Sequence, residues 1–381
     1  MTASGARRLL LHIGMHKTGS SSIQESFKGF VDADRTRYAT IALAPNHGYH
    51  LRIPFEQDIA PVMASLAPGA QPVPGTGELR AFLEELEHPA QDLIVSGEAF
   101  STFDHKAVGQ FLDTVAPSGR HIEVLCYLRD PITLPGSFFQ QHVKEMLLSE
   151  PVMPAPEYQA ALTPWLDLLP RDQFTFRKFT PSTLKDGNVF TDFCDWAGVD
   201  PVKISEKRTN TALPDGCVRL LWQLNRLHNA SPKTADHIAA YTDLNLRLRD
   251  TISGPAFTTP IACLSDTSEM RATLGWVVQH TGIDFRPEVE AAAQEMKGRP
   301  LGEELNRIDS TTRAQLGALL NEMKVFRHRR APVDVLMARL YRSAVKRARW
   351  QRRRNAIWRT TPRTAPVDPD EHGFRQDMLR R

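Results

Sequence analysis

The sequence has few cysteines and no long hydrophobic run. Its four cysteines, at positions 126, 194, 217 and 263, lie far apart and form no CxxC pair, so neither a zinc-binding cluster nor a disulfide framework is indicated. We therefore expect reduced thiols in a cytoplasmic protein that requires no metal. No stretch approaches the ~18 apolar residues of a membrane-spanning helix. The apolar run after Arg7 and Arg8 is too short for a secretory signal peptide and lacks a small-residue cleavage site.

Strong overall charge and extreme composition are also lacking. Hydrophobic residues make up 41% and charged residues 24% of the 381 positions, which argues against wholesale disorder and allows a sizeable core. The net charge of +3 hides an asymmetry, because residues 324–359 contain 13 Lys or Arg and a single acid, Asp334. We expect a mildly acidic body followed by a basic tail.

Short apolar strands alternate with helical segments in the first half of the chain. Helices are expected from about residue 20, over 77–89, over 107–117 and over 134–148, and strands over 8–14, 92–96, 121–128 and 173–179. Residues 45–77 are rich in turn formers and are expected to form a surface connection or lid. The alternation predicts an α/β fold with a parallel sheet and helices on both faces, in which ligands bind at the carboxyl ends of the strands.

The second half is expected to be mainly helical. Residues 216–322 form a helical extension to a motif-bearing core at 8–215, and together they make one domain over 1–322. Residues 323–381 form the basic tail, in which 334–359 alternates apolar and arginine positions as an amphipathic helix does, and the last twenty residues are expected to be disordered.

The segment LLLHIGMHKTGSSSIQ, residues 9–24, joins a strand to a helix through a glycine-containing loop. Backbone N–H groups at a helix N-terminus bind anions. The glycines allow close approach, and a lysine and three hydroxyls can donate hydrogen bonds to a phosphate. A plain turn whose serines cap the helix is the alternative reading. The candidate phosphate-binding residues are His16, Lys17, Thr18, Gly19, Ser20, Ser21 and Ser22.

This loop departs from the Walker A pattern GxxxxGK[ST] of nucleotide triphosphatases. Lys17 precedes Gly19 instead of following it, so the loop is poorly shaped to wrap a triphosphate. No acidic strand end suited to magnesium accompanies it. The order of residues therefore disfavours an ordinary ATPase.

A second phosphate-type motif follows the strand at 121–128. Arg129 stands at the carboxyl end of that strand, Pro131 breaks the chain, and Ser137 follows at the start of a helix. Arginine offers a bidentate fork to a phosphate, and a serine at a helix N-terminus adds a hydroxyl and the helix dipole. A surface ion pair with Asp130 is the alternative for Arg129. Two such motifs suit a ligand with phosphates at both ends.

Together the motifs resemble those of sulfotransferases that use 3′-phosphoadenylyl sulfate (PAPS), and the loop is similar to the bacterial branch of that family. The family's loop reads Lys-[Ser/Thr]-Gly-[Ser/Thr]-[Ser/Thr], and its 3′-phosphate motif is Arg-x-Pro followed by a serine. The resemblance implies a three-layer α/β/α fold of the P-loop NTPase-like type, with PAPS as donor and PAP as product. It also implies that Lys17 neutralises the bridging oxygen as the bond breaks. A later basic loop, EKRTNTALP, contains Lys207, Arg208 and Asn210 and is similar to bacterial family sequences around its Arg-x-Asn element. The resemblance makes Lys207 and Arg208 candidates for binding the 3′-phosphate, although the family's Arg-Lys-Gly triplet is absent. A solvated charge run is the alternative.

Sulfuryl transfer needs a base to accept the proton of the acceptor. His47, expected in an irregular loop, is one candidate, because histidine titrates near neutral pH. If the register of that loop differs from the expected one, His50 takes its place. Glu98, at the end of the strand over 92–96, is the other, because it faces the ligand edge of the sheet. The alternatives are a loop histidine in contact with water only and a glutamate that pairs with a lysine.

Two other functions are compatible with these features. A small-molecule kinase would also place a phosphate loop first and an arginine later. A non-enzymatic protein could bind an anionic surface through the basic tail, where Trp350 and Trp358 lie among arginines. For the transferase, the resemblance implies a hydroxyl- or amine-bearing acceptor, by default a glycan or lipid-linked saccharide, with a small metabolite or a peptide tyrosine as the alternatives. The tail would then bind peripherally to the inner face of an anionic membrane. We do not expect nucleic acid as a partner.

Overall fold

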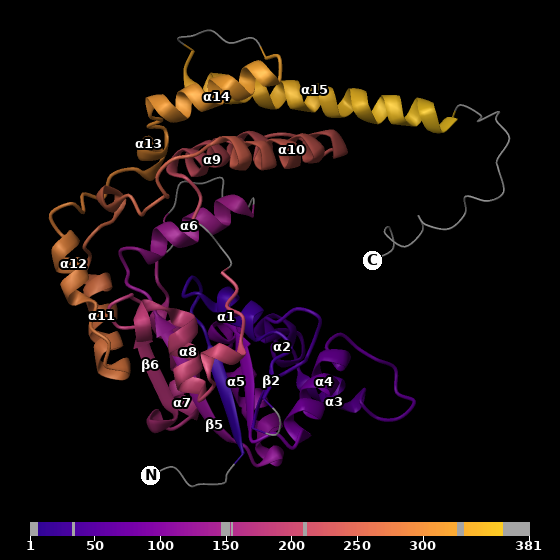
Figure 1. Ribbon diagram of the computed structural model, residues 1–381, viewed down its shortest axis with the longest axis vertical. Coiled ribbons are helices and arrows are strands. Elements are labelled where there is room, and N and C mark those ends of the chain that lie inside the picture. The colour runs from indigo at the N-terminus through magenta and orange to yellow at the C-terminus, as the bar shows by residue number, and fades with distance from the viewer. Residues whose placement is uncertain are drawn as a thin grey trace. The chain divides into compact units, whose positions relative to one another are not determined.

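The computed structural model describes most of the chain, and its compact parts form two units (Figure 1). The first unit contains residues 1–222 and 253–309, and the second contains 223–252 and 310–381. This division differs from the tail boundary near residue 323 that composition suggests. The described residues are 7–32, 35–145, 153, 155–208, 212–325 and 331–360, with side chains described up to 354.

The first unit is built on a six-stranded, mostly parallel sheet. The strands are β1 (Arg8–Ile13), β2 (Val31–Asp32), β3 (Thr36–Tyr38), β4 (Asp92–Gly97), β5 (His121–Leu128) and β6 (Phe174–Lys178). Their order across the sheet is β2-β3-β4-β1-β5-β6, and only the β2–β3 pair is antiparallel. The predictions of β1, β4, β5 and β6 are confirmed, whereas β2 and β3 are too short to leave a pattern in the sequence.

Helices cover both faces of this sheet. The helices of the first unit are α1 (Ser20–Phe27), α2 (His47–Phe55), α3 (Ile59–Ala64), α4 (Thr76–Glu87), α5 (His105–Val115), α6 (Leu134–Lys144), α7 (Tyr158–Leu168), α8 (Val189–Ala197), α11 (Ser268–Thr281), α12 (Arg286–Ala292) and α13 (Leu301–Leu305). Short 3₁₀ turns occur at η1 (Glu98–Thr102), η2 (Ala116–Ser118), η3 (Arg171–Gln173), η4 (Lys185–Gly187), η5 (Pro201–Lys203) and η6 (Ile261–Cys263).

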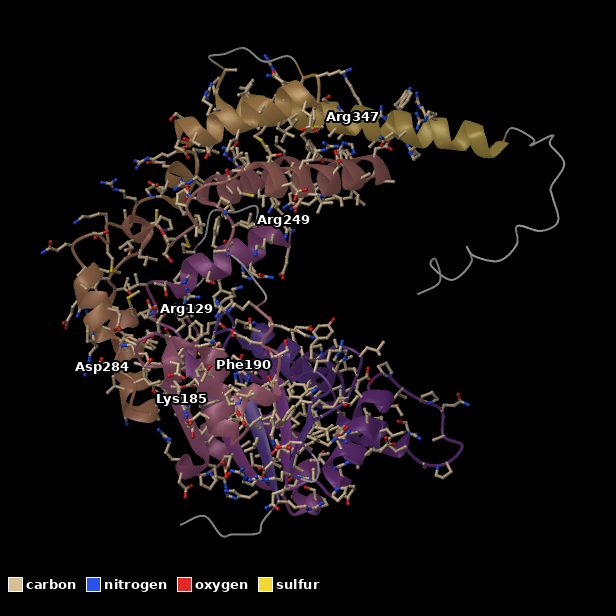
Figure 2. The ribbon with its side chains drawn as sticks, in the orientation of Figure 1. Arg129, Lys185, Phe190, Arg249, Asp284 and Arg347 are labelled. Carbon is tan, nitrogen blue, oxygen red and sulfur yellow. The ribbon has the colours of Figure 1, made fainter. Side chains whose placement is uncertain are left out.

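Alternate strand residues enter two separate cores. Leu9 and Leu11 of β1 pack in one core with helices that include α4, α5 and α7, while Leu10 packs in the other with α1 and α8, the helix that carries Phe190 (Figure 2). Side chains of a strand alternate between the faces of its sheet, so both faces are buried. The α/β class is therefore confirmed, and the arrangement is compatible with a three-layer α/β/α fold.

The prediction of an irregular loop over 45–77 is wrong for its first part, where α2 and α3 lie, whereas residues 65–75 contain no helix or strand. Asn46 caps α2 by accepting a hydrogen bond from the Tyr49 N–H at 3.5 Å. Gly48 disfavours a helix by propensity, yet its backbone packs directly on Gly97, where an added Cβ would come within 2.1 Å of the Gly48 nitrogen. The burial of Leu51 and its neighbours outweighs the helix-breaking residues.

The second unit is helical, as predicted for this part of the chain. It contains the end of α9 (Asp215–Asn229), together with α10 (Ala235–Thr251), α14 (Ser310–Glu322) and α15 (Val333–Thr360). α10 and α15 lie side by side, and the buried Asp236 of α10 holds Arg352 of α15 with an Nε–Oδ1 distance of 2.9 Å. Arg347 of α15, which is labelled in Figure 2, donates to the Met323 carbonyl. The disorder predicted for the last twenty residues concerns positions outside the described residues.

α15 is amphipathic, as its sequence predicts. Leu336, Met337, Leu340 and Tyr341 are buried. A set of exposed cations, which we call the basic stripe, runs along the helix at helical spacing and consists of Arg342, Lys346 and Arg353, whereas Arg349 pairs with the buried Asp236 of α10 at 3.4 Å. Trp350 beside it is 58% exposed, and the Arg354 guanidinium lies 4.8 Å from its ring centroid. Within the described residues, no helix combines the length and apolar character needed to cross a membrane.

Candidate active site

The loop between β1 and α1 turns sharply before the helix begins. Lys17 has φ 68° and Gly19 has φ 82°, so two residues adopt the left-handed conformation within three positions. A Cβ on Gly19 would lie 2.8 Å from Val189 Cγ1, so a larger residue there would be strained and would have to displace Val189. The Thr18 hydroxyl is buried and donates to the Met15 carbonyl at 2.6 Å. Thr18 therefore holds the turn, while its neighbours face the cavity described below.

Sheet topology places this loop between two others. β1 is hydrogen-bonded to β4 on one side and β5 on the other, all parallel, with Ile13 opposite Gly97 and His12 opposite Leu125. The residues that follow β4 and β5 are Glu98 and Arg129. Because the carboxyl ends of parallel strands meet at one edge of the sheet, the loop, Glu98 and Arg129 come together there.

A cavity of about 600 Å³ opens at this edge, within the size range of ligand sites. It lies wholly within the first unit. Of the residues predicted to bind or act on a ligand, those on its wall are His16, Lys17, Gly19, Ser20, Ser21, Ser22, Glu98, Arg129 and Ser137. The two phosphate-type motifs, more than 100 residues apart in the chain, thus share one cavity.

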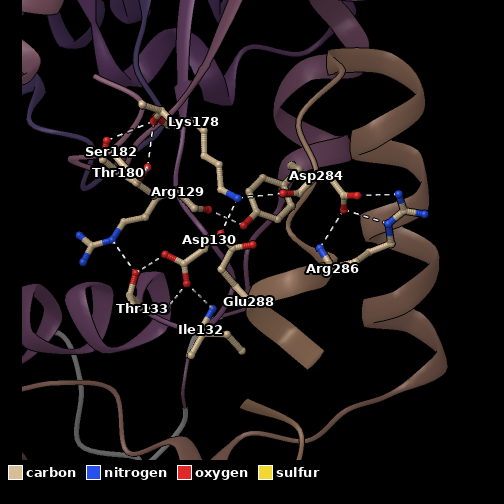
Figure 3. A network of polar contacts seen from close by, with 12 residues as sticks. Arg129, Asp130, Ile132, Thr133, Lys178, Thr180, Ser182, Asp284, Arg286 and Glu288 are labelled. Atoms are coloured by element: carbon tan, nitrogen blue, oxygen red, sulfur yellow. Dashed lines mark hydrogen bonds and ion pairs between the residues drawn. The ribbon is translucent and has the colours of Figure 1, made fainter. Parts of the chain in front are cut away.

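Arg129 is held from two sides. Its Nε donates to Thr133 Oγ1 at 3.0 Å (Figure 3), and its Nη1 donates to the Lys17 carbonyl at 3.1 Å. Asp130, the alternative ion-pair partner, instead accepts hydrogen bonds from Thr133 and from the Ile132 N–H, so it shapes the turn before α6. The pKa of Arg129 is lowered, because the effect of burial exceeds that of the nearby Asp130 charge, which raises it. The bond to Lys17 ties the second motif directly to the first.

Lys17 extends into the cavity. Its Nζ donates to Gln141 Oε1 of α6 at 3.3 Å. Burial lowers the pKa of Lys17, and so does the charge of Arg129, while Glu98 raises it. Two cations close together in a partly desolvated space are costly on their own. Their arrangement favours an anion bound between them.

Glu98 and His16 form a pair on the wall beside Lys17. The distance from His16 Nδ1 to Glu98 Oε2 is 3.1 Å. Burial by itself raises the pKa of Glu98. The hydrogen bond to His16, the positive charge of His16 when its ring is protonated, and the charge of Lys17 outweigh this effect, so the pKa of Glu98 is lowered. The Ser20 hydroxyl contributes in the same direction, although it lacks a hydrogen bond of standard geometry. Glu98 is thus a carboxylate at neutral pH.

Among the residues that the structure describes, two buried polar atoms near the start of the loop have no hydrogen-bond partner of standard geometry. They are Ser20 Oγ and His12 Nε2, which lie 2.5 Å and 3.2 Å from the position of a Cβ added to Gly14. Burial lowers the pKa of His12 to about 4, so the ring is neutral. Buried polar atoms are rarely left unpaired in folded proteins. An unpaired Ser20 hydroxyl on the cavity wall suits a ligand that accepts a hydrogen bond.

His47 does not lie on the cavity wall. It begins α2, is 1% exposed, and its Nδ1 accepts a hydrogen bond from the Ser96 N–H at 3.1 Å. A hydrogen bond to the Ala39 backbone raises the pKa of His47, but burial has the larger, opposite effect and lowers it to about 3. His50, its alternate, is also on α2 and outside the lining. The structure therefore separates the predicted histidine bases from the loop.

Lys207 and Arg208, the candidates from the later basic loop over 206–214, do not lie on the cavity wall either. The Lys207 N–H donates to Ser26 Oγ at 2.8 Å, and exposed Arg208 pairs with Glu206 at 3.1 Å. Neither residue is on the wall, whereas Ala212 is. The Arg-x-Asn element of this loop includes Asn210, which lies outside the described residues.

Several wall residues have no signal in the sequence. Gln141 of α6 holds Lys17, and Phe257, Thr258 and Thr259 come from a segment far along the chain. Thr259 Oγ1 accepts a hydrogen bond from the Gly136 N–H at 3.0 Å, which docks this segment on α6. Phe138 could have been suspected, because it follows Ser137 directly. The remaining wall residues are Thr133, Gln140, His142, Lys144, Glu145 and Phe179.

Within the described part of the chain, no group of three or more His, Cys, Asp or Glu side chains is arranged to hold a metal ion. Comparisons of the chain with protein-family models, with curated proteins and with solved structures found no match. The interpretation of the cavity therefore depends on its own geometry and chemistry.

Proposed function

We propose that this protein is a sulfotransferase that moves a sulfuryl group from PAPS to a hydroxyl or amine acceptor. The observation that carries the proposal is that Lys17, Arg129 and the hydroxyls of Ser20, Ser21, Ser22 and Ser137 share the wall of one cavity. Cations with hydroxyl and backbone donors are the usual ligands of phosphate. PAPS has a phosphosulfate at one end of its adenosine and a phosphate on the other side of the ribose, so it needs two such sites.

In this proposal the loop over 14–22 binds the 5′-phosphosulfate, and Arg129 with Ser137 binds the 3′-phosphate. The N-terminus of α1 and the unpaired Ser20 hydroxyl favour an anion at the loop. Phe138, Phe179 and Phe257 offer apolar surface for the adenine. We also propose that the fold is of the P-loop NTPase-like type, in which the phosphate-binding loop over 14–22 follows the central strand β1.

The residues on the wall would act by charge and position. Transfer develops negative charge on the oxygen that bridges sulfur and the 5′-phosphate, and preorganised donors stabilise such charge. Lys17 is tethered by Gln141 and lies beside the loop N–H groups, so it is held ready to donate to that oxygen. The Arg129 bond to the Lys17 carbonyl keeps the two donor sites at a fixed separation.

The acceptor is proposed to carry a hydroxyl group on a glycan or lipid-linked saccharide. The basic stripe of α15, with the exposed Trp350, supports contact with an anionic membrane, because exposed cations and an interfacial tryptophan favour such a surface. The apolar side of α15 is already buried within the second unit, so the helix would bind the membrane through its charges and would not insert into it. We propose a cytoplasmic protein that binds the inner face of the membrane in this way.

Donor turnover tests the proposal. The purified protein is incubated with ³⁵S-labelled PAPS and a panel of phenols, glycosides and glycolipids, and labelled product is separated from donor. We expect transfer to at least one hydroxyl acceptor, with ATP unable to replace PAPS. Phosphorylation of an acceptor by γ-labelled ATP, with no sulfation, would favour a kinase instead.

A further inference from the structure

His16 and Glu98 are held together by neighbouring strands at the reacting end of the cavity. His16 belongs to the loop after β1, and Glu98 is the first residue after β4, the strand paired with β1. Their Nδ1–Oε2 distance is 3.1 Å, and their side chains are 41% and 21% exposed. The ring of His16 also lies against Phe138 of α6, with centroids 5.8 Å apart. The pair is therefore fixed in place and open to the cavity.

The charge state of Glu98 determines which nitrogen of His16 carries a hydrogen. A carboxylate only accepts hydrogen bonds. Because Glu98 is ionised, Nδ1 must be the donor in the pair. A neutral imidazole carries hydrogen on one nitrogen, so Nε2 then has a free lone pair. The hydrogen-bond network thus selects the tautomer that can accept a proton at Nε2.

We infer that His16 Nε2 is the general base for the acceptor and that Glu98 is the positioning residue that orients and polarises it. The inference rests on the proposed function, because it requires sulfuryl transfer at this cavity. Carboxylate–histidine pairs of this form hold the imidazole in its reactive tautomer and stabilise the imidazolium that forms. The sequence suggested His16 only as a donor-binding residue and Glu98 as the base itself.

The step is balanced as follows. The acceptor oxygen forms a bond to sulfur while the bond between sulfur and the 5′-phosphate oxygen breaks, and the leaving phosphate keeps that electron pair beside Lys17. The acceptor proton passes to His16 Nε2, which becomes a cation paired with the Glu98 carboxylate. Release of that proton to water restores the neutral ring.

Other candidates fit this step less well. Glu98 already accepts the His16 hydrogen bond, and its lowered pKa makes it a weak base. His47 is buried away from the wall, where its Nδ1 is occupied by the Ser96 N–H. His16 combines exposure to the cavity, a fixed tautomer and direct adjacency to Lys17.

Substituting His16 separates proton transfer from donor binding. General-base catalysis contributes about 10²–10⁴-fold to rate. We expect His16→Ala to slow the turnover of labelled PAPS by about 100-fold or more, whether water or the best acceptor of the panel receives the sulfuryl group. PAP affinity, measured by calorimetry, should change by less than about threefold, because a base for the acceptor does not hold the donor. Added imidazole should restore part of the turnover.

Glu98→Gln tests the positioning role. It should slow turnover in the wild-type background but add little to His16→Ala, because a residue that acts through His16 has no effect once His16 is gone. The chain offers a matched control in the exposed pair His105–Asp167, whose Nε2–Oδ2 distance is 2.7 Å and whose side chains are each 56% exposed outside the cavity. His105→Ala should leave turnover and PAP affinity unchanged.

The outcomes distinguish this inference from the proposed function. If the wild-type protein binds no PAP and turns over no PAPS, the proposed function fails. If the wild type is active and His16→Ala retains its turnover, or loses PAP affinity in proportion to turnover, the assignment of His16 as base is overturned. Additive effects of His16→Ala and Glu98→Gln would overturn the positioning role of Glu98.

Discussion

Replacement of Arg129 by alanine should remove the protein's preference for a 3′-phosphate. A guanidinium has five N–H groups, and its bonds to Thr133 and the Lys17 carbonyl use two of them. The remaining donors are available to the ligand. Two charge-assisted hydrogen bonds of about 1.5 kcal/mol each give about 3 kcal/mol, which corresponds to a loss of affinity on the order of 100-fold.

The assay compares two ligands that differ only at the 3′ position. Calorimetry with PAP and with adenosine 5′-phosphate should give a PAP preference on the order of 100-fold for the wild type, from the same bond energies. In Arg129→Ala that preference should fall to about one, with the affinity for adenosine 5′-phosphate nearly unchanged. Arg129→Lys keeps the charge but not the planar fork, so we expect an intermediate preference.

Arg286 provides the control, because it is an exposed arginine outside the cavity that pairs with Asp284 at 2.6 Å (Figure 3). Arg286→Ala should change neither affinity. Equal losses for the two ligands in Arg129→Ala would refute the assignment, since they would show that Arg129 acts only by holding the loop through the Lys17 carbonyl. An unchanged PAP preference would refute it as well.

Three further predictions follow from the same geometry. Lys17→Met should lower PAPS turnover about 10²–10³-fold, as loss of a transition-state donor does, with the fold intact by circular dichroism; unchanged turnover would rule out its role. Burial lowers the pKa of His12 to about 4 and of His47 to about 3, so both rings take up protons when the protein unfolds in mild acid. The free energy of unfolding should therefore be greatest above about pH 6.5 and should fall as the pH drops toward 4. Urea titrations should show this fall, weakened in His47→Gln; an identical pH slope would contradict the buried neutral ring. Reversing the charges of the basic stripe at Arg342, Lys346 and Arg353 should abolish binding to phosphatidylglycerol vesicles at low salt without changing PAP affinity, and retained binding would exclude the stripe.

The strands that build the site were predictable because their signals are local. β1, β4 and β5 contain the apolar runs LLL, LIV and VLCYL, and short runs of this kind that end near Gly97 or Arg129 are typical of buried parallel strands. Helix α2 was missed because its sequence contains Gly48 and Pro54, and the packing that stabilises it comes from β4, nearly 50 residues later. Tertiary packing of this kind leaves no trace in local propensity.

The site was predictable to the extent that parallel-strand topology determines it. Lys17 and Arg129 each follow a strand, so a shared sheet edge brings them together. The burial of His47 follows from the helix that local propensity disfavours, and the contribution of Phe257–Thr259 depends on a contact with Gly136 across more than 100 residues. His16 was noted beside Lys17, but its partnership with Glu98 required the register between β1 and β4.

Direct binding of the donor product tests the central claim most simply. Calorimetric titration of the wild-type protein with PAP, and separately with ATP and magnesium, measures which nucleotide the cavity recognises. We predict saturable PAP binding that needs no metal and exceeds ATP binding by on the order of 100-fold, the value expected for a dedicated 3′-phosphate site. Tighter binding of magnesium–ATP, or no binding of PAP, would contradict the account.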